Sequence, residues 1–370
     1  MQIAYGTVSA VPPACLIRKL SDDLIIAVFA CAPFASHGTL RAVCRSLRAA
    51  LQSPAFREER RATGAEERGV VVVGGVTRDE SRTGECWLLS DVVAGRATTM
   101  TRLMPLSAPR YSASSLVWKD EVWVLGGRNG AAVLNSSIAF DPRTQLWRAC
   151  PSMGERRSGA VAGVVGGVLV VAGGLSVRGG APSYLMSAEV LRYPAKTAST
   201  AAAAAWESLP PLPHAAWLAT AGVLGGRLHV CGGVRSDWLQ IWDGTAWSLG
   251  APMPQPRWAA ASAVTRDGRL VVIGGTLAPS FGDTASVIVY DPAVNMWREE
   301  VAELPPLPTP RSGCRTLETA TGGLLVVGGG GPPLLLEAGA REWSELPSPV
   351  GDDGEYLASS GAVCESVLLG

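Results

Sequence analysis

Few residues in this chain have the types and spacing that catalysis or metal binding requires. The 370 residues include three histidines, and the eight cysteines occur without a Cys-x-x-Cys pair or a Cys/His ligand spacing. Asp141, Asp243 and Asp291 each precede Pro or Gly, where aspartate usually serves a turn. His229 lies inside the apolar segment RLHVCGG and is expected to be a packed residue. The sequence therefore predicts no catalytic pair, cofactor, metal site or disulfide framework, and scattered thiols suit a reducing compartment.

Arginine is the chemically versatile side chain that recurs at regular intervals. Four arginines each follow a proline-bearing or Met-Gly turn at the point where a repeated unit starts. They are Arg110, Arg157, Arg257 and Arg311. In one unit His214 occupies the equivalent place. The elements that position these side chains are therefore the repeats themselves.

The repeated unit runs from about residue 70 to the end, and its clearest copy is 257–311. In each copy an apolar, β-branched segment such as RLVVIGG ends at two glycines, and the spacing centres near fifty residues. Glycine allows the backbone to leave a strand at positive φ, so each pair predicts a strand end. The first five pairs end at Gly75, Gly127, Gly174, Gly233 and Gly275, and the sixth begins at Gly328.

A tryptophan recurs after each of the last five glycine pairs. These residues are Trp147, Trp206, Trp247, Trp297 and Trp343. Because a four-stranded sheet is too thin to bury both faces alone, a large flat side chain at a fixed place can fill the wedge between sheets. The first unit lacks this tryptophan, and 100–106 is expected to supply its outer strand.

The glycine pair, the Tyr290-Asp291-Pro292 element, the tryptophan and the proline-rich turn with arginine together resemble kelch repeats. The resemblance implies a mainly β protein with a kelch-type β-propeller over residues 69–370, with six blades favoured and seven possible. The tail 356–363 resembles a first strand and is expected to join the N-terminal blade, which would hide two sheet edges. Ser366 to Leu369 resembles a further second strand, so the number of blades stays open. A solenoid or sandwich is the alternative fold.

The kelch resemblance also implies a role for the four arginines. In kelch adaptors of ubiquitin ligases, arginines at this place point toward the mouth of the central channel and bind acidic peptide groups bidentately. Arg110, Arg157, Arg257 and Arg311 are therefore candidates for substrate binding. The other interpretation, that they tie adjacent blades together through backbone carbonyls, is equally open. Kelch-fold oxidases and mutarotases form a third class, but the propeller has only His214 and His229 as histidine ligands and no identifiable acid/base pair.

The region 16–60 has a helical pattern instead. Ser21 can cap a helix whose first turn carries Asp22 and Asp23, and Pro33 ends it. A second helix is expected after Gly38-Thr39, closed by Ser53-Pro54. The apolar face of the first helix comprises Leu24, Ile25, Val28 and Phe29. The apolar face of the second helix comprises Leu40, Val43, Cys44, Leu47 and Leu51. Because about forty residues cannot bury enough apolar surface alone, this region is expected to seek a partner surface.

This helical region resembles an F-box, the module that docks onto the Skp adaptor of cullin-type ubiquitin ligases. The matching residues are Leu20, Asp22, Asp23, Leu24, Pro33, Leu40, Arg41, Val43, Cys44, Arg45, Arg48, Leu51, Ser53, Pro54 and Phe56. Ser21 and Leu47 depart from the Pro and Trp usual in the family, which lowers the expected adaptor affinity. The resemblance implies adaptor binding through Leu20, Leu24, Ile25, Val28, Phe29, Leu40, Val43, Cys44, Leu47 and Leu51. The alternative is an ordinary helical hairpin packed on the next domain. A charged linker is expected at 61–68, between the helical region and the repeats.

Charge and hydropathy limit the remaining possibilities. The net charge is +0 and the pI is about 6.8, without a Lys/Arg run that would neutralise phosphates, so nucleic-acid binding is not expected. The N-terminal segment does not read as a signal peptide, and the uncharged stretch between Arg157 and Arg178 is broken by glycines. The sequence thus predicts a soluble, non-catalytic substrate receptor of a ubiquitin ligase in the cytoplasm or nucleus. Its alternatives are a non-degradative kelch scaffold and, less favoured, a kelch-fold enzyme.

Overall fold

The structure is a computed structural model that describes residues 26, 29, 40–43, 45–63, 67–76, 82–90, 99–192, 204–299, 304–319, 321–346 and 363–369. The chain divides into two compact units. One comprises Met1–Glu67, Pro142–Gln145 and Leu368–Gly370, and the other comprises Arg68–Asp141 and Leu146–Val367. No helix among the described residues is both long and apolar enough to cross a membrane.

The first unit contains helices α4 (Arg45–Leu51) and α5 (Pro54–Ala62). Ser53 caps α5, because its Oγ accepts the backbone N–H of Phe56 at 3.1 Å while Pro54 occupies the first turn, where a missing N–H costs nothing. The charged residues after Phe56 continue this helix. The predicted linker 61–68 is therefore wrong in its bounds, since α5 includes residue 62 and the first strand already begins at Glu67.

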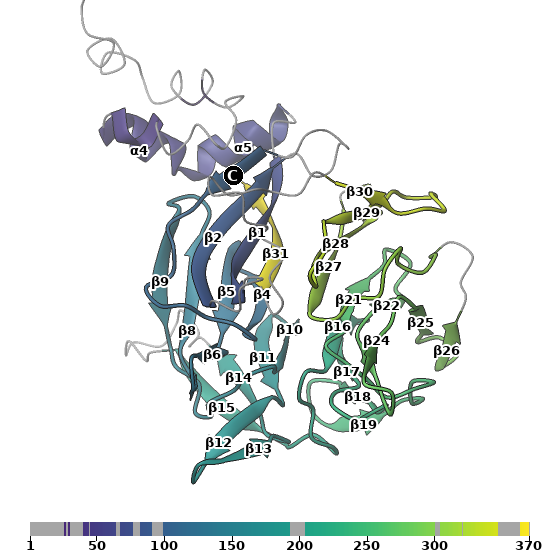
Figure 1. Cartoon of the computed structure of the whole chain (residues 1–370). Helices are drawn as coiled ribbons and strands as arrows, with labels where there is room; N and C mark the ends of the chain where they lie inside the picture. Colours follow the sequence, from purple (N-terminus) through teal and green to yellow (C-terminus); the bar gives the residue numbers. More distant parts are fainter. Residues whose placement is uncertain are drawn as a thin grey trace, which may run out of the picture. The chain divides into compact units, whose positions relative to one another are not determined.

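The second unit is mainly β, as the sequence predicts, and its described part forms six four-stranded sheets (Figure 1). The first sheet has the order β3 (Thr99–Arg102), β2 (Arg82–Ser90), β1 (Glu67–Val76), β31 (Val363–Leu369). The second is β4 (Ser114–Trp118), β5 (Glu121–Leu125), β8 (Ser137–Asp141), β9 (Leu146–Cys150), and the third is β10 (Val161–Val165), β11 (Val168–Ala172), β14 (Ala188–Arg192), β15 (Ala205–Leu209). The fourth is β16 (Thr220–Leu224), β17 (Arg227–Cys231), β18 (Leu239–Trp242), β19 (Trp247–Leu249). The fifth is β21 (Ala261–Val264), β22 (Leu270–Ile273), β25 (Val287–Asp291), β26 (Met296–Glu299), and the sixth is β27 (Cys314–Glu318), β28 (Leu324–Gly328), β29 (Leu334–Leu336), β30 (Ser344–Glu345).

Smaller ladders extend the loops that follow the glycine pairs. In three sheets, the connection between the second and the third strand takes part in such a ladder. They are β6 (Arg128–Asn129) with β7 (Ala132–Val133), β12 (Leu175–Arg178) with β13 (Ala181–Tyr184), and β20 (Arg257–Trp258) with β23 (Thr276–Leu277) and β24 (Gly282–Asp283). In the fourth and sixth sheets the third strands are short, at four and three residues.

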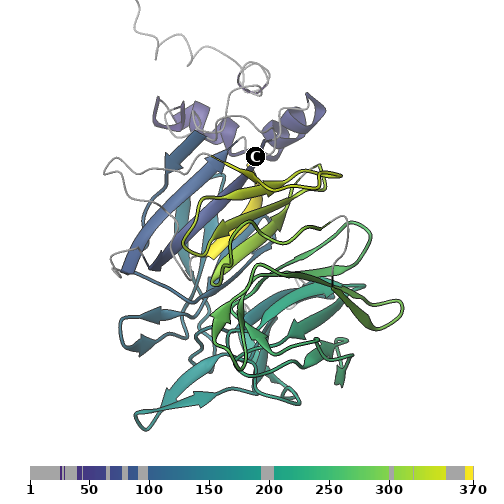
Figure 2. The ribbon, with the colours of Figure 1, turned by 45° about the vertical axis from the view of Figure 1, so that its right-hand side comes forward.

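The C-terminal strand joins the first sheet. The yellow β31 lies beside the blue β1 in both ribbon views (Figures 1 and 2). A strand of the tail thus joins the N-terminal sheet, as expected, but this strand is Val363–Leu369 and not the predicted 356–363. Residues 356–362 lie outside the described residues, and Ser366 to Leu369 is not a separate second strand, because 363–369 is one continuous strand.

Apolar clusters join each pair of consecutive sheets from the second onward. Val170 and Val190 of the third sheet, for example, share a cluster with Val230 of the fourth. Equivalent clusters join the second to the third, the fourth to the fifth and the fifth to the sixth. A further cluster packs Val72 of the first sheet against Leu325 of the sixth. The ends of the repeat series are thus in contact.

The recurring tryptophans lie between consecutive sheets, as predicted, and they also form polar links. Each indole N–H donates to a backbone carbonyl just after the last strand of the preceding sheet, over 2.8–2.9 Å. The pairs are Trp147 with Met104, Trp206 with Pro151, Trp247 with Pro210, Trp297 with Ala251, and Trp343 with Pro305. The side chain therefore fills the wedge and satisfies a loop carbonyl at once.

Candidate functional site

The four predicted arginines are buried, with 9% of Arg110, 1% of Arg157, 4% of Arg257 and 2% of Arg311 exposed. Nη1 of Arg110 donates to the carbonyls of Gly126 (2.8 Å) and Ser136 (3.0 Å), and Nη2 donates to Ser136 Oγ (2.9 Å). Arg257 repeats these contacts with Gly274 and Ser286. Each guanidinium group is thus directed at the glycine pair and third strand of its own sheet.

The backbone of each arginine reaches the preceding sheet. The carbonyl of Arg157 accepts the N–H of Gly127 at 2.8 Å, and the equivalent bonds join Gly75 to Arg110, Gly233 to Arg257 and Gly275 to Arg311. The first glycine of the pair is equally close, since a Cβ on Gly126 would lie 2.3 Å from the Arg157 carbonyl oxygen. Each arginine therefore links two consecutive sheets.

These contacts correct the prediction that the four guanidinium groups bind substrate. Their donors face backbone carbonyls inside the sheets, and Arg311 likewise donates to Pro332 O at 2.6 Å. Burial lowers the pKa of Arg110 and of Arg257 to about 10, which reflects the removal of these cations from water. The contacts support the other interpretation of the sequence, in which the arginines tie adjacent blades together.

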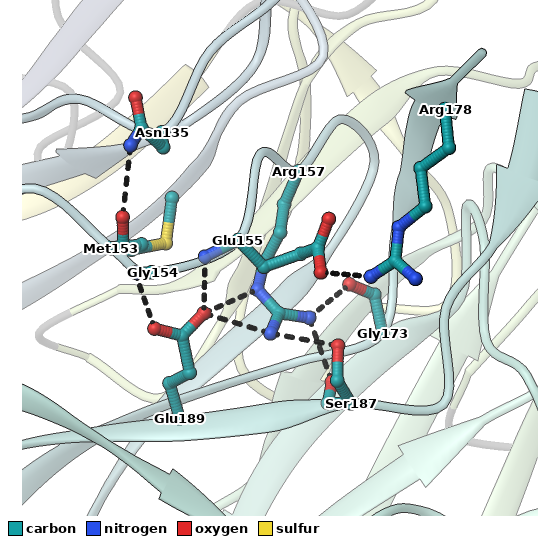
Figure 3. A network of polar contacts seen from close by, with 9 residues as sticks. All are labelled: Asn135, Met153, Gly154, Glu155, Arg157, Gly173, Arg178, Ser187 and Glu189. Atoms are coloured by element: carbon teal, nitrogen blue, oxygen red, sulfur yellow. Dashed lines mark hydrogen bonds and ion pairs between the residues drawn. The ribbon is translucent and has the colours of Figure 1, made fainter.

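Arg157 differs from the other three because a carboxylate accompanies it (Figure 3). Glu189 Oε1 accepts hydrogen bonds from Arg157 Nη2 (2.8 Å) and Nε (3.2 Å), and the Glu189 carboxylate also accepts the N–H groups of Gly154 (2.6 Å) and Glu155 (3.1 Å). Burial lowers the pKa of Arg157, while the hydrogen bond and charge of Glu189 act in the opposite direction. The pair is therefore an internal ion pair, satisfied on both sides.

The fourth sheet lacks the arginine, and Ala216 stands in its place. The Ala216 carbonyl accepts the N–H of Gly174 at 2.7 Å, which is the bond that the arginine carbonyl accepts elsewhere. The prediction that His214 is the equivalent residue is therefore wrong by two positions. Trp238 takes the place of the serine, and its ring stacks on His214 with centroids 4.2 Å apart and an angle of 4°. Gln240, fully buried, accepts the N–H of His214 at 2.8 Å.

The residues just before the first strands form a chain of backbone hydrogen bonds. Gly159 N–H donates to Ser112 O, Leu218 to Gly159, Ala259 to Leu218 and Gly313 to Ala259, over 2.8–2.9 Å. All five residues have positive φ, including the non-glycines Ser112 (50°), Leu218 (55°) and Ala259 (50°). Such conformations persist only where the surroundings impose them. We call this end of the second to sixth sheets the mouth.

A cavity of about 210 Å³ lies between the first strands next to the mouth. Its lining consists mainly of Ala, Ser, Thr and Val side chains from β4, β10, β16, β21 and β27. Arg315 is the charged residue of this lining. Several of the hydroxyls bond within the protein, as Ser114 Oγ does to Ala160 O at 2.7 Å. The cavity is smaller than a pocket for a drug-sized ligand and has no paired acid and base.

Exposed aromatic side chains gather at the mouth of the third, fourth and fifth sheets. Tyr184, Trp238 and Phe281 are 54%, 37% and 58% exposed, and each lies in the loop between the second and third strands or at its end. Trp217 and Trp258 follow Ala216 and Arg257 directly. We call these five residues the aromatic surface. Sequence reasoning missed it, although an aromatic residue next to the repeated arginine position was a visible signal.

The apolar residues predicted to bind an adaptor divide into three groups. Leu20, Leu24, Ile25, Val28 and Cys44 lie outside the described residues. Leu47 and Leu51 are 0% and 3% exposed and form a core cluster with Phe56, against which Phe29 and Leu40 pack. The prediction that Leu47 and Leu51 face an adaptor is therefore corrected, because they are used in the core of the helical unit. Val43 remains 40% exposed.

The residues considered for catalysis have structural roles. Asp243 Oδ1 accepts the N–H groups of Thr245 (2.7 Å) and Ala246 (2.9 Å), and these bonds lower its pKa to about 2. Asp291 Oδ1 accepts the N–H of Ala293 in the equivalent turn. His229 is 4% exposed and lies in β17, with its pKa lowered by burial. These observed roles, in turns for Asp243 and Asp291 and in packing for His229, are the ones that the sequence predicts.

Comparisons with known proteins agree with the repeat pattern. Residues 109–154 match the family described as Kelch motif. An F-box/kelch-repeat protein of Arabidopsis thaliana is 27% identical over 53% of this chain and 50% of its own length. Kelch-like protein 35 of Mus musculus is 31% identical over 30% of this chain and 18% of its own length, and Kelch repeat and BTB domain-containing protein 13 of Homo sapiens is 38% identical over 27% and 23%. The chain spans half or less of the length of these relatives.

A solved structure has the same fold. The structure of YjhT superposes with a TM-score of 0.58 over 75% of this chain and 97% of that chain, at 15% identity. The second unit thus shares its fold with YjhT and contains a segment similar to the Kelch motif. At this identity the likeness concerns the fold alone.

Proposed function

We propose that the chain is the substrate-recognition subunit of a cullin-type ubiquitin ligase. Its N-terminal helical unit docks onto a Skp-type adaptor as an F-box, and its kelch sheets bind the protein to be ubiquitinated. The chain itself is not a catalyst, because the transfer chemistry belongs to the partner enzyme. The proposal rests on one chain having both a helical region whose sequence resembles an F-box and a segment similar to the Kelch motif, the combination that the name of the Arabidopsis relative states.

In this proposal the six sheets are the six blades of a closed propeller, and the mouth is its recognition face. The contact of Val72 with the cluster around Leu325 supports closure between the first and sixth blades. The exposed aromatic surface supports the choice of face, since interfaces are enriched in aromatic side chains at their centre. We expect the protein to act in the cytoplasm or nucleus, without nucleic acid or membrane as a partner.

Adaptor binding tests this function. The full chain is co-purified with a Skp-type adaptor, as wild type and as the variants Val43→Asp and Val294→Asp. Val43 lies in the helical unit and is 40% exposed, whereas Val294 lies in a turn of the fifth sheet and is 53% exposed. A charge at an apolar contact should remove most of the bound adaptor from the Val43 variant only. Failure of the wild type to bind, or equal binding by all three chains, would remove the ligase assignment.

A non-degradative kelch scaffold is the second candidate. The burial of Leu47 and Leu51 favours it, because these residues belong to the surface that an F-box would offer to its adaptor. In that case the helices have a structural role and the propeller alone binds partners. A wild-type chain that retains protein partners in cells, but neither the adaptor nor the cullin, is the result expected for a scaffold.

A further inference from the structure

The aromatic surface draws on three consecutive sheets, and ring contacts join the third to the fourth and the fourth to the fifth. The rings of Tyr184 and Trp217 stack with centroids 5.1 Å apart and an angle of 17°, which joins the third sheet to the fourth. The guanidinium carbon of Arg235, in the fourth sheet, lies 5.7 Å from the ring centroid of Phe281 in the fifth, and Phe281 contacts Trp258 edge-on at 5.6 Å. Neighbouring sheets thus hold these rings against one another, so the surface needs little ordering before it binds.

These rings differ from the tryptophans that lie between the sheets. Trp147, Trp206, Trp247, Trp297 and Trp343 all donate their indole N–H to a loop carbonyl. In the part of the chain that the structure describes, the indole N–H groups of Trp217, Trp238 and Trp258 have no such acceptor. The surface therefore combines ring faces with indole N–H groups that no described residue accepts.

The fourth sheet shows how this arrangement arises. Where the second, third and fifth sheets have an arginine bonded to a serine, this sheet has Ala216 and Trp238. The small alanine leaves out the guanidinium group, and Trp238 instead turns a stacked, 37% exposed ring to the mouth. The loss of an internal tie in the fourth sheet thus coincides with the gain of an exposed aromatic side chain.

We infer that the aromatic surface binds an extended, proline-rich segment of the partner protein, in a polyproline II conformation. Such a segment has no internal hydrogen bonds, so its carbonyls can accept from the indole N–H groups and from Arg235. Its pyrrolidine rings pack on aromatic faces, and its fixed backbone lowers the entropy lost on binding. This inference rests on the proposed role of the propeller in protein recognition, whichever of its two candidate functions is correct.

Other ligand chemistries fit the surface less well. A helical ligand uses its carbonyls internally, so it would cover the indole donors without pairing them, at a cost in affinity. An acidic segment would pair with Arg235 but would have no use for the exposed rings of Tyr184 and Trp238. An extended segment rich in proline satisfies both the rings and the donors.

The inference is tested with peptides and the purified full chain. A ten-residue oligoproline peptide is titrated by calorimetry and by tryptophan fluorescence, beside Gly-Ser and oligoglutamate peptides of the same length. We expect saturable binding of oligoproline, with a Kd below about 1 mM, and no saturation with the other two. Trp238→Ala and Phe281→Ala should each weaken binding about tenfold or more, since central aromatic residues dominate such contacts. Met296→Ala is the matched control, because Met296 is 58% exposed, like Phe281, but lies in β26.

Three results would overturn the inference. They are tighter binding of oligoglutamate than of oligoproline, no saturable binding of oligoproline, and equal weakening by the Met296 variant. Sedimentation of the free chain adds a fourth, since a dimer that Trp238→Ala dissociates would assign the surface to a second copy. Circular dichroism melts of each variant check that the fold is retained. Adaptor co-purification is a separate measurement, so failure of the ligase role and failure of peptide binding are distinguishable.

Discussion

Replacing Arg157 with alanine is expected to lower the free energy of unfolding by about 3–5 kcal/mol, the usual effect of breaking a buried ion pair. The side chains of Arg157 and Glu189 are 1% and 7% exposed, so water cannot replace the lost partner. The Gly173 and Ser187 carbonyls each lose a hydrogen bond of 2.7–2.9 Å. The largest part of the cost arises because the buried carboxylate of Glu189 stays charged and keeps only its two backbone N–H donors.

A second substitution should relieve part of this damage. Glu189→Gln removes the charge but keeps an oxygen that accepts the N–H of Gly154, as Gln240 accepts the N–H of His214 in the sheet that lacks the arginine. In the Arg157→Ala background it should therefore restore at least about 1 kcal/mol. Arg110→Ala is the matched control. Ile138 occupies the register position of Glu189 there, so only neutral acceptors are left unpaired, at about 1–3 kcal/mol.

Urea unfolding at pH 7, followed by tryptophan fluorescence and circular dichroism, measures these free energies with a common m value. A free-energy cost of Arg157→Ala no larger than that of Arg110→Ala would contradict an uncompensated buried charge on Glu189. A Glu189→Gln substitution that adds to the damage of Arg157→Ala instead of relieving it would contradict it equally, because the cost would then not arise from a buried charge.

Three further predictions concern single positions. Gly126→Ala should destabilise the protein by clearly more than Gly130→Ala in urea unfolding. Both glycines have φ near 60°, so the left-handed backbone costs each alanine variant about 1–2 kcal/mol. An added Cβ meets the Arg157 carbonyl oxygen at 2.3 Å at Gly126 but only open space at Gly130. Trp297→Phe should cost about 1 kcal/mol through the lost bond to Ala251 O, whereas Trp258→Phe, which loses no such bond, should stay within about 0.5 kcal/mol. The folded-state pKa of Asp243 lies below its ordinary value, so its contribution to stability is present above about pH 4 and is lost as the pH falls toward 2. When Tm is measured by circular dichroism at several pH values, Asp243→Ala should therefore show a smaller fall in Tm between about pH 4 and about pH 2 than the wild type.

Much of the second unit could be predicted because its signals are local. A β-branched segment that ends at two glycines predicts a strand and its end from a few neighbouring residues. The tryptophans could be assigned to the wedges because their place in the repeat is constant, and all five make the same bond. The helix after Pro54 and the strand from Glu67 were placed less well, since highly charged segments suit a helix, a linker or an exposed strand end alike.

The candidate site could be predicted only in part. The arginines were found by their spacing, but their direction depends on the carbonyls of Gly126 and Ser136, which lie 16 and 26 residues further along the chain. Counting residues placed His214 at the arginine position, whereas the bond from Gly174 identifies Ala216. Leu47 shares a helical face with Val43 in sequence, yet Phe56 of the next helix covers the one and not the other.

The sequence by itself determined the repeat, the strands within it and the residues that return in every unit, because periodicity and backbone preference act over a few residues. Only the tertiary structure decided which of those recurring residues are buried and hydrogen-bonded within the fold and which remain exposed for binding. A guanidinium group bonds to carbonyls that its own sheet brings within about 3 Å from 16 or more residues further along the chain, and an indole N–H bonds to a carbonyl of the preceding sheet. The arginines therefore became internal ties, and the exposed aromatic residues at the mouth, unremarked in the sequence, became the candidate recognition surface.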